Sequence, residues 1–350
     1  MSRFFDPKLS ALTPYTPGEQ PKDRLLLKLN TNESPFPPSP LAQRYAREEA
    51  GRLELYSDPC CTALVKKGAE VFGVEEDEII FTNGSDEVLD FTFQAFCPKG
   101  AIFPDITYGF YKVFAALHQI PFTEVPLKED FTIDLQDYLG TSGTVFIANP
   151  NAPTGLYLTP AQVETIVSSD PDRLVVIDEA YIDFGGETSI PLTKKYDNLL
   201  VIGTFSKSRS MAGARLGFAI GNKALIRCLN TIKYSFNPYN VDRMAMAAGV
   251  GALEDKDYFR TNCEKIMATR AWTTEALEKL GFTVLPSLTN FVFAKHDRIP
   301  GKTLCAKLRE QGILVRHFDT PRLTDYLRIT IGSQEQMEAF AGAITNILEG

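Results

Sequence analysis

The chain has 350 residues, of which 44% are hydrophobic and 23% charged, and its formal net charge is −8. This length suggests two domains, and the composition is that of a folded globular protein. The negative charge argues against nucleic-acid and anionic-membrane partners, because both require a positive surface, and it favours small soluble substrates.

The sequence shows no sign of membrane insertion, secretion or metal binding. It contains no run of 18 apolar residues, and its first residues lack the hydrophobic segment and cleavage site of a secretory leader. We therefore expect a cytoplasmic protein. The six cysteines form no Cys-x-x-Cys pair and the three histidines have no paired spacing, so we expect no protein-built metal site.

The first part of the chain predicts an arm followed by a large domain. Residues 1–40 contain eight prolines and little periodicity, which is typical of an extended arm lying across another surface. In residues 41–240, short β-branched or aromatic runs alternate with helical stretches, which predicts a mostly parallel seven-stranded sheet. The last strand follows too closely for a crossover helix and is expected to be antiparallel. The predicted strands are 79–82, 101–103, 122–125, 145–148, 174–177, 199–202 and 217–220.

Residues 241–350 predict a smaller α+β domain against which the arm packs. A long helical stretch to about Leu280 comes first, and four short apolar runs follow it at 283–285, 291–293, 313–315 and 327–330. The predicted fold class is therefore α/β, with a large and a small domain.

Polar residues follow several of the predicted strands, where an open parallel sheet binds its ligands. Segment 83–87 is a glycine turn that opens a helix, whose free N–H groups make an anion site. A simple helix cap by Ser85 is the alternative. Segment 149–155 is a proline-rich turn that could be merely a tight turn. Asp178 ends the fifth strand, where a buried carboxylate needs a partner such as a protonated ring nitrogen.

Segment 203–217, after the sixth strand, carries the strongest functional signal. A lone lysine is usually a solvated surface charge, but Lys207 follows a parallel strand and has the hydroxyls of Thr204 and Ser206 beside it. Together with Arg215 these hydroxyls could hold a phosphate dianion. A phosphate cradle, an amine nucleophile and a buried carboxylate are what a pyridoxal phosphate site requires.

These segments resemble the fold type I pyridoxal-phosphate aminotransferases, and among them the histidinol-phosphate aminotransferase family, over essentially the whole chain. The resemblance implies that Lys207 holds pyridoxal 5′-phosphate as a Schiff base. It also implies that Asp178 keeps the ring nitrogen protonated and that Tyr181 bonds the phenolic oxygen. The matching segments are 29–33, 56–59, 84–87, 149–155, 178–181, 204–207, 215 and 327–330.

The resemblance also implies roles for residues elsewhere in the chain. Tyr108 would stack on the cofactor ring, and Tyr56 would reach the phosphate bound by a neighbouring subunit, so that a homodimer has composite sites. Arg328 would bind the acidic end of the substrate. The residues implied to hold the cofactor phosphate are Ser85, Asp86, Thr204, Ser206 and Arg215, and those implied to lie near the substrate are Tyr15, Asn32, Asn290, Arg316 and Arg328.

Two positions depart from the family pattern. Ser57 stands where proline is usual, and Ala152 stands where the family has an asparagine that supports the phenolic oxygen. We expect Asn149 to take over this role, with Asn151 as the second choice and a water molecule as the remaining alternative.

The expected reaction is the transamination of L-histidinol phosphate with 2-oxoglutarate, which yields imidazole acetol phosphate and glutamate in histidine biosynthesis. An aromatic amino acid aminotransferase and a threonine-phosphate decarboxylase are alternatives with the same fold. A P-loop nucleotidase is a weaker one, because segments 175–179 and 301–303 resemble its motifs in the wrong order. No GxGxxG segment supports a dehydrogenase, and a regulator without catalysis would not need Lys207, Asp178 and Arg215 together.

Overall fold

The apolar runs between residues 79 and 221 form one seven-stranded sheet. In the computed structural model, which describes residues 2–9, 12–16, 18–20 and 26–349, its strand order is β2-β8-β7-β6-β5-β3-β4. β8 is antiparallel to both of its neighbours, as predicted, and the other pairs are parallel. The strands are β2 (Ile79–Asn83), β3 (Ala101–Pro104), β4 (Phe122–Val125), β5 (Thr144–Ala148), β6 (Val175–Asp178), β7 (Leu199–Thr204) and β8 (Leu216–Gly221).

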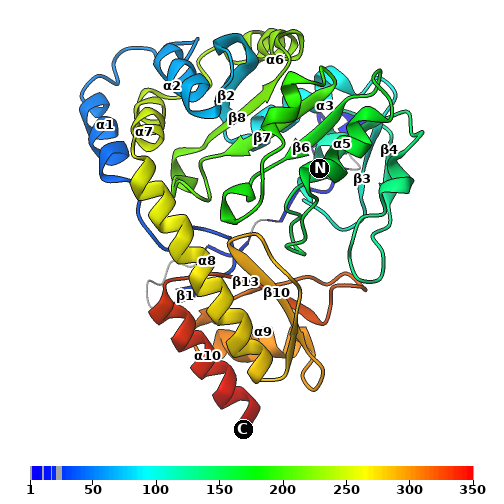
Figure 1. Ribbon diagram of the computed structural model, residues 1–350, viewed down its shortest axis with the longest axis vertical. Coiled ribbons are helices and arrows are strands. Elements are labelled where there is room, and N and C mark those ends of the chain that lie inside the picture. Colours follow the sequence, from blue (N-terminus) through cyan, green and yellow to red (C-terminus); the bar gives the residue numbers. More distant parts are fainter. Residues whose placement is uncertain (1, 10–11, 17, 21–25, 350) are drawn as a thin grey trace.

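Helices cover both faces of this sheet, which confirms the α/β class (Figure 1). In β5, Val145 and Ile147 point to the core shared with α2, α5 and α7, whereas Phe146 points to the core shared with α3, α4 and α6. All three side chains are fully buried, which explains why the strand is a continuous apolar run. The helices of this part are α1 (Pro40–Ala50), α2 (Thr62–Phe72), α3 (Ser85–Phe96), α4 (Phe110–Leu117), α5 (Pro160–Ser168), α6 (Lys223–Phe236) and α7 (Arg243–Glu254).

The C-terminal part of the chain builds a smaller antiparallel sheet in the order β12-β13-β10-β9. The predicted run 313–315 does not join it as a single strand. Its first part, β11, pairs instead with β1 of the arm, and β12 begins only after Val315. The elements are β1 (Leu27–Lys28), β9 (Phe282–Val284), β10 (Phe291–His296), β11 (Ile313–Leu314), β12 (Arg316–His317), β13 (Tyr326–Thr330), α8 (Lys256–Lys279), α9 (Gly301–Glu310) and α10 (Gln334–Glu349). In the described part of the chain, no helix is both long and apolar enough to cross a membrane.

The long helix predicted after residue 240 is two helices, α7 and α8, with a break at Asp255. The apolar side of α7 belongs to the core of the large sheet, and α8 runs from there to the small sheet (Figure 1). The boundary expected near residue 240 stays a prediction, and the packing of α7 favours a boundary after Glu254.

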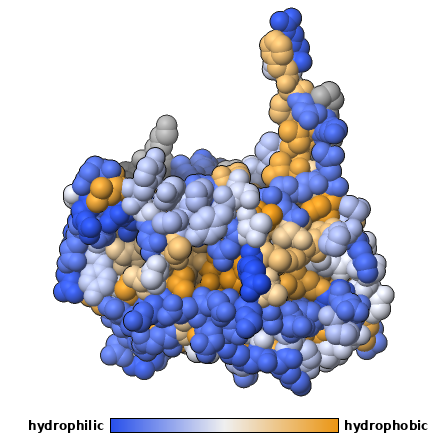
Figure 2. Space-filling view, turned by 90° about the horizontal axis from the view of Figure 1, so that it is seen from above, coloured by the Kyte–Doolittle hydropathy of each residue, from blue (hydrophilic) through white to orange (hydrophobic). Residues whose placement is uncertain are grey.

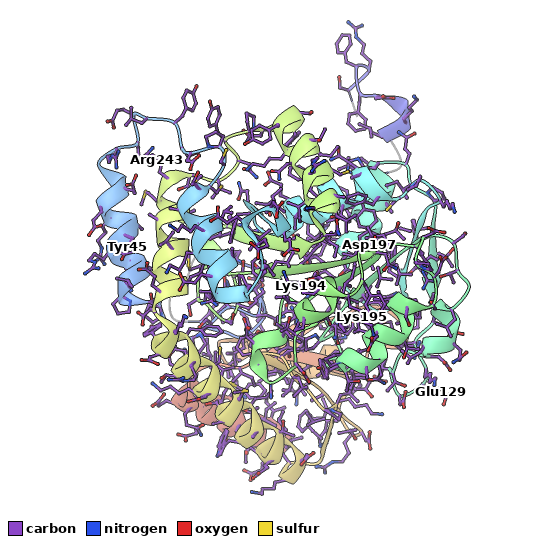
Figure 3. All side chains as sticks on the ribbon, turned by 45° about the horizontal axis from the view of Figure 1, so that its top comes forward. Tyr45, Glu129, Lys194, Lys195, Asp197 and Arg243 are labelled. Carbon is purple, nitrogen blue, oxygen red and sulfur yellow. The ribbon has the colours of Figure 1, made fainter. Side chains whose placement is uncertain are left out.

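The packing of α7 against α1 fixes α1 on the large domain. Arg243 donates to Glu49 Oε2 at 2.9 Å, and Tyr45 donates to Glu254 Oε2 at 2.8 Å, so polar pairs connect α1 to both ends of α7; Arg243 and Tyr45 are labelled in Figure 3. Gly251 lies against the first turn of α1, where an added Cβ would be 2.7 Å from Ala42 N.

The N-terminal arm, predicted over residues 1–40, projects from the body over its first residues and then returns to it (Figures 2 and 3). Residues 1, 10–11, 17 and 21–25 of this arm lie outside the described part. The returning segment is anchored by the pairing of β1 with β11 and by an ion pair between Glu19 and Arg309. The arm thereby reaches the region between the two sheets.

Gly251 supplies a stability test of the α1–α7 contact. We expect Gly251→Ala to lower the free energy of unfolding by about 1–3 kcal/mol, because the new methyl group must push the backbones apart. Gly342 in α10 is the matched control. An added Cβ there would meet nothing within 4 Å beyond its own helix turns, and a helical alanine should stabilise by about 0.5–1 kcal/mol. Urea unfolding followed by circular dichroism measures both. Equal effects of the two substitutions would contradict the close contact.

Candidate active site

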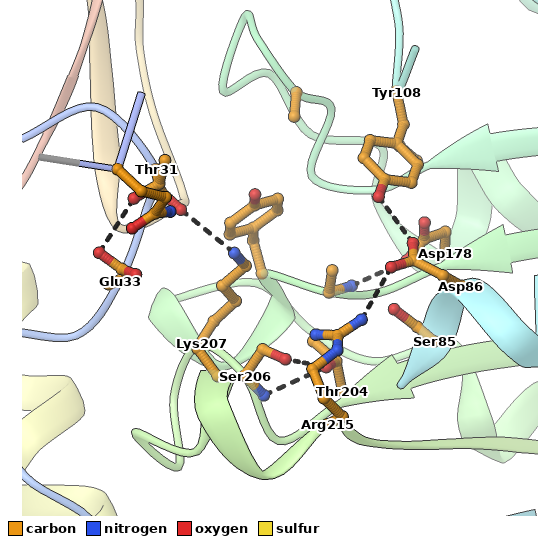
Figure 4. Close-up of a pocket in the computed structure, with 16 residues that line it drawn as sticks. Thr31, Glu33, Ser85, Asp86, Tyr108, Asp178, Thr204, Ser206, Lys207 and Arg215 are labelled. Atoms are coloured by element: carbon orange, nitrogen blue, oxygen red, sulfur yellow. Dashed lines mark hydrogen bonds and ion pairs between the residues drawn. The ribbon is translucent and has the colours of Figure 1, made fainter. Parts of the chain in front are cut away.

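Two adjoining cavities lie beyond the carboxyl ends of β5, β6 and β7, between the large sheet and the arm (Figure 4). Six residues line both cavities, among them Tyr108, Tyr181 and Lys207. The first cavity is lined by nine of the predicted cofactor residues, namely Ser85, Asp86, Tyr108, Asp178, Tyr181, Thr204, Ser206, Lys207 and Arg215. The second is lined by four of the five residues expected near the substrate, namely Tyr15, Asn32, Arg316 and Arg328.

One end of the first cavity is built to hold an anion. Ser85 is the first residue of α3 and Gly84, with a φ of 81°, is its cap, so the simple cap by Ser85 is wrong. The leading N–H groups of α3 lack helical acceptors and give this end a positive potential. A Cβ at Gly217 would lie 2.3 Å from Ser85 N, so β8 can support this turn so closely only with glycine there.

Arg215 and two hydroxyls complete this end. The Arg215 guanidinium lies over Gly84, and Nη2 donates to Asp86 Oδ2 at 2.9 Å. Thr204 Oγ1 donates to Ser206 Oγ at 3.0 Å. The ion pair of Arg215 is partly exposed and adds little stability, so its effect is to orient the guanidinium.

Asp178 lines the first cavity from the end of β6, with 5% of its surface exposed. Its Oδ1 accepts from the Ala180 N–H at 3.2 Å, and its Oδ2 accepts from the Tyr111 hydroxyl at 3.1 Å. Burial raises the Asp178 pKa to about 6, against the opposing effect of these two hydrogen bonds. The carboxylate is therefore a buried charge suited to a cationic ligand group.

Lys207 lies where the two cavities meet. Its Nζ is 3.5 Å from the carbonyl oxygen of Thr31 in the arm and 5.8 Å from the centroid of the Tyr181 ring. The Tyr181 hydroxyl accepts from Asn32 Nδ2 at 2.9 Å. Tyr108, on the other side of the cavity, donates to Asp86 Oδ1 at 2.7 Å, which fixes its ring at the cavity wall (Figure 4).

The second cavity carries two arginines. Arg328 is held by Asn30 O, to which its Nη2 donates at 3.1 Å, and lies against the rings of Phe291 and Phe318. Burial lowers its pKa, yet a guanidinium stays charged in proteins. Arg316 Nη2 donates to Thr16 O at 3.4 Å, so the arm helps to position both cations. Among the described residues, Arg328 Nε has no hydrogen-bond partner.

The expected replacement for the asparagine missing at Ala152 is wrong. Asn149 does not line the cavity, because its Nδ2 donates to Leu158 O at 2.8 Å and its Oδ1 accepts from Leu158 N at 2.7 Å. Asn151, the second choice, is bonded to Ile106 O and to the Thr154 hydroxyl. Both amides stabilise the turn that carries them, while Ala152 itself lines both cavities.

Asn32 lines the second cavity, but its side chain is committed to protein groups. Its Nδ2 donates to the Tyr181 hydroxyl, and its Oδ1 accepts from Thr330 Oγ1 at 3.1 Å. Asn290 donates to Asn32 O at 2.9 Å and does not line either cavity. Tyr56 lies outside both cavities of its own chain, stacked on Tyr239 with 81% of its surface exposed.

Several residues of the site were missed at the level of sequence, and three of them contact or adjoin its functional groups. Thr31 and Glu33 of the arm line the first cavity beside Lys207, and Tyr111 contacts Asp178 from α4. Tyr111 follows Tyr108 by three residues, but Tyr108 lies before the start of α4, so helical spacing did not predict the contact of Tyr111 with Asp178. Thr31 and Glu33 belong to the matching segment 29–33, but the resemblance implied no role for either of them.

The residues present fit pyridoxal 5′-phosphate. A dianion suits the end formed by α3 and Arg215, an aromatic wall is present at Tyr108, an amine stands at the centre, and the buried Asp178 carboxylate accepts few hydrogen bonds of its own. The fold and this site define a fold type I, pyridoxal-phosphate-dependent transferase.

The chain belongs to the aminotransferase class I and II family, whose model matches residues 24–344. It is 48% identical to a histidinol-phosphate aminotransferase of Brachyspira hyodysenteriae over all of both chains, and 45% identical to one of Clostridium botulinum over 99% of each. Its structure is similar to that of the histidinol-phosphate aminotransferase of Sinorhizobium meliloti in complex with pyridoxal 5′-phosphate. This similarity has a TM-score of 0.91 at 25% identity and covers 100% of this chain and 98% of the other.

The anion end is tested by comparing ligands with and without a phosphate group. We expect Arg215→Gln to weaken the binding of pyridoxal 5′-phosphate about tenfold or more, and that of pyridoxal much less, because the lost charge-assisted hydrogen bonds go to the phosphate. Absorbance titration measures both affinities. The exposed Arg227 supplies a control variant, Arg227→Gln, that should change neither. An equal loss for both ligands would place Arg215 elsewhere than on the phosphate.

Proposed function

We propose that this protein transfers the amino group of L-histidinol phosphate to 2-oxoglutarate, giving imidazole acetol phosphate and glutamate in histidine biosynthesis. The observation that carries the proposal is the position of Lys207 between an anion-holding end and a second cavity with two arginines. The full-length relatives at 45–48% identity, named as histidinol-phosphate aminotransferases, support this substrate. Such a biosynthetic role fits the expected cytoplasmic location.

The chemistry divides between cofactor and protein. Pyridoxal phosphate, when bound, supplies a ring that withdraws electrons from the amino-bearing carbon of the substrate. Lys207 is the amine that would hold the cofactor. Once the substrate amine has replaced it there, its Nζ, at the junction of the cavities, would be the base that removes the substrate Cα proton and then returns it as an acid. Thr31 O lies within reach of this amine and can orient it.

Asp178, Tyr181 and Tyr108 prepare the cavity for this step. The Asp178 carboxylate can keep a ring nitrogen protonated by accepting its N–H. The positive charge on that nitrogen would offset the cost of burying the carboxylate. Tyr181 offers its hydroxyl proton to an oxygen acceptor, since it receives the Asn32 N–H and keeps its own O–H for a ligand. Tyr108 would cover one face of the cofactor ring and exclude water from that face.

The two arginines explain how one cavity accepts two different amino compounds. Histidinol phosphate brings a phosphate and no carboxylate, whereas glutamate brings two carboxylates. A guanidinium binds either group through two parallel hydrogen bonds, so Arg328 can anchor both substrates. Arg316 and Tyr15 lie at the arm, where small movements of the chain can adapt the cavity to the remaining part of each substrate.

Amino-donor preference tests the proposed substrate. We expect kcat/KM for histidinol phosphate to exceed that for phenylalanine or tyrosine by about two orders of magnitude or more, because only the phosphate can engage the arginines fully. Steady-state kinetics with 2-oxoglutarate measures this ratio. Lys207→Ala is the control and should lose multiple turnover with every donor. Preference for an aromatic amino acid would move the assignment to the aromatic aminotransferases.

We also infer that two copies of the chain form a homodimer with composite sites. Exposed aromatic and aliphatic side chains gather on the segments 53–56 and 234–239, and Tyr56 among them is too exposed for a residue that serves its own chain alone. A second copy is the partner that the implied role of Tyr56 requires. In such a dimer Tyr56 would complete the anion end of the other subunit.

Subunit mixing tests the composite site. A dimer formed from one Lys207→Ala chain and one Tyr56→Phe chain contains one site with both residues intact, provided that Tyr56 acts on the partner. We expect mixed dimers, formed by co-expression with two affinity tags, to recover transamination that neither parent homodimer reaches. Mixed dimers no more active than the average of the two parents would show that Tyr56 does not act across the interface.

A further inference from the structure

Tyr111 is a buried tyrosine whose hydroxyl has a single, defined partner. It belongs to α4, and its ring lies among Phe103 at 5.8 Å, Phe146 at 5.8 Å and Tyr108 at 5.7 Å between centroids. The side chain has no exposed surface, and its hydroxyl donates to Asp178 Oδ2 at 3.1 Å. A ring held on several sides cannot turn its hydroxyl elsewhere.

The hydrogen bond acts on a carboxylate that has little other support. Asp178 receives only one further hydrogen bond among the described residues, from the Ala180 N–H to Oδ1. The charged groups facing it are Asp86, which opposes its ionisation, and Lys207, which favours it, while Arg215 is engaged with Asp86. Tyr108 is a partly buried neutral phenol beside it, and Glu179 turns away to Thr188 and Ser189.

We propose that Tyr111 is a positioning residue that holds the Asp178 carboxylate in its charged form and aims its free lone pairs at the ligand in the first cavity. The role of that ligand rests on the proposed function, but the contact between Tyr111 and Asp178 does not. A hydrogen bond to the charged form of an acid favours that form. The direction of the Asp178 pKa agrees, because burial raises it and the Tyr111 bond lowers it.

The consequence has a defined sign. Because the Asp178 pKa in the folded chain, at about 6, lies above the value of 3.8 for an unperturbed aspartate, ionisation of this group costs stability as the pH rises through that interval. Tyr111→Phe removes the hydroxyl and keeps the ring, so it raises this pKa further. The variant should therefore lose more stability at high pH, where the carboxylate is charged, than at low pH, where it is neutral.

The test compares the cofactor-free, full-length chain with Tyr111→Phe between about pH 5 and pH 8. We expect the difference in melting temperature to widen as the pH rises. Tyr138→Phe is the matched control, because Tyr138 is 1% exposed and its hydroxyl has no partner among the described residues. The difference in melting temperature between Tyr138→Phe and the unchanged chain should therefore not depend on pH. In an Asp178→Asn background the pH dependence of Tyr111→Phe should vanish. A pH-independent difference in the wild-type background would overturn the proposal.

A second measurement links this contact to the cofactor. Tyr111→Phe should bind pyridoxal 5′-phosphate about tenfold more weakly than the unchanged chain, and Tyr138→Phe as tightly. Unchanged affinity in Tyr111→Phe would confine the residue to a structural role and overturn its effect on the ligand. Failure of the unchanged chain to bind this cofactor would instead contradict the proposed function, and the pH profile would still decide the role of Tyr111.

Discussion

The burial of one carboxylate is the constraint on which the site depends. Asp178 ends the central strand β6, where helices cover both faces of the sheet and water is largely excluded. A charge in such a place persists only if hydrogen bonds and a cationic partner offset the loss of hydration. The Tyr111 hydroxyl and the Ala180 N–H supply the hydrogen bonds. The cavity beside Asp178 supplies the space for a cationic partner.

Cationic groups line both cavities although the chain carries a net charge of −8, and carboxylates lie among them. The α3 terminus and Arg215 lie at one end, Arg316 and Arg328 lie in the second cavity, and Lys207 stands between them. The cofactor phosphate at the first of these sites and an anionic group of the substrate at the second would therefore hold the reacting atoms of both molecules at the lysine amine. Positioning of this kind lowers the entropic part of a barrier before any chemistry begins.

The returning arm connects the two sheets at the site. Asn32 joins Thr330 of the small sheet to Tyr181, which follows β6 of the large sheet, and Asn30 and Thr31 hold Arg328 and Lys207 through their carbonyl oxygens. An amide side chain beside Tyr181 thus comes from the arm and not from the turn that carries Ala152. A shift of the small domain would be felt at Tyr181 through this chain of hydrogen bonds.

The sequence alone determined the strands of the large sheet, the reversed direction of β8 and the polar residues that follow these strands, because apolar runs and glycine turns are local features and parallel strands end at one edge. It could not determine the partners of Asn149, since an amide bonds to whatever backbone the fold brings near it, here that of Leu158. Nor could the sequence assign α7 to the core of the large sheet, because an apolar helix face shows that the helix packs against something but does not identify the surface it packs against. The contact of Tyr111 with Asp178 also belongs to the tertiary structure alone, since it depends on how α4 is rotated and seated against β6.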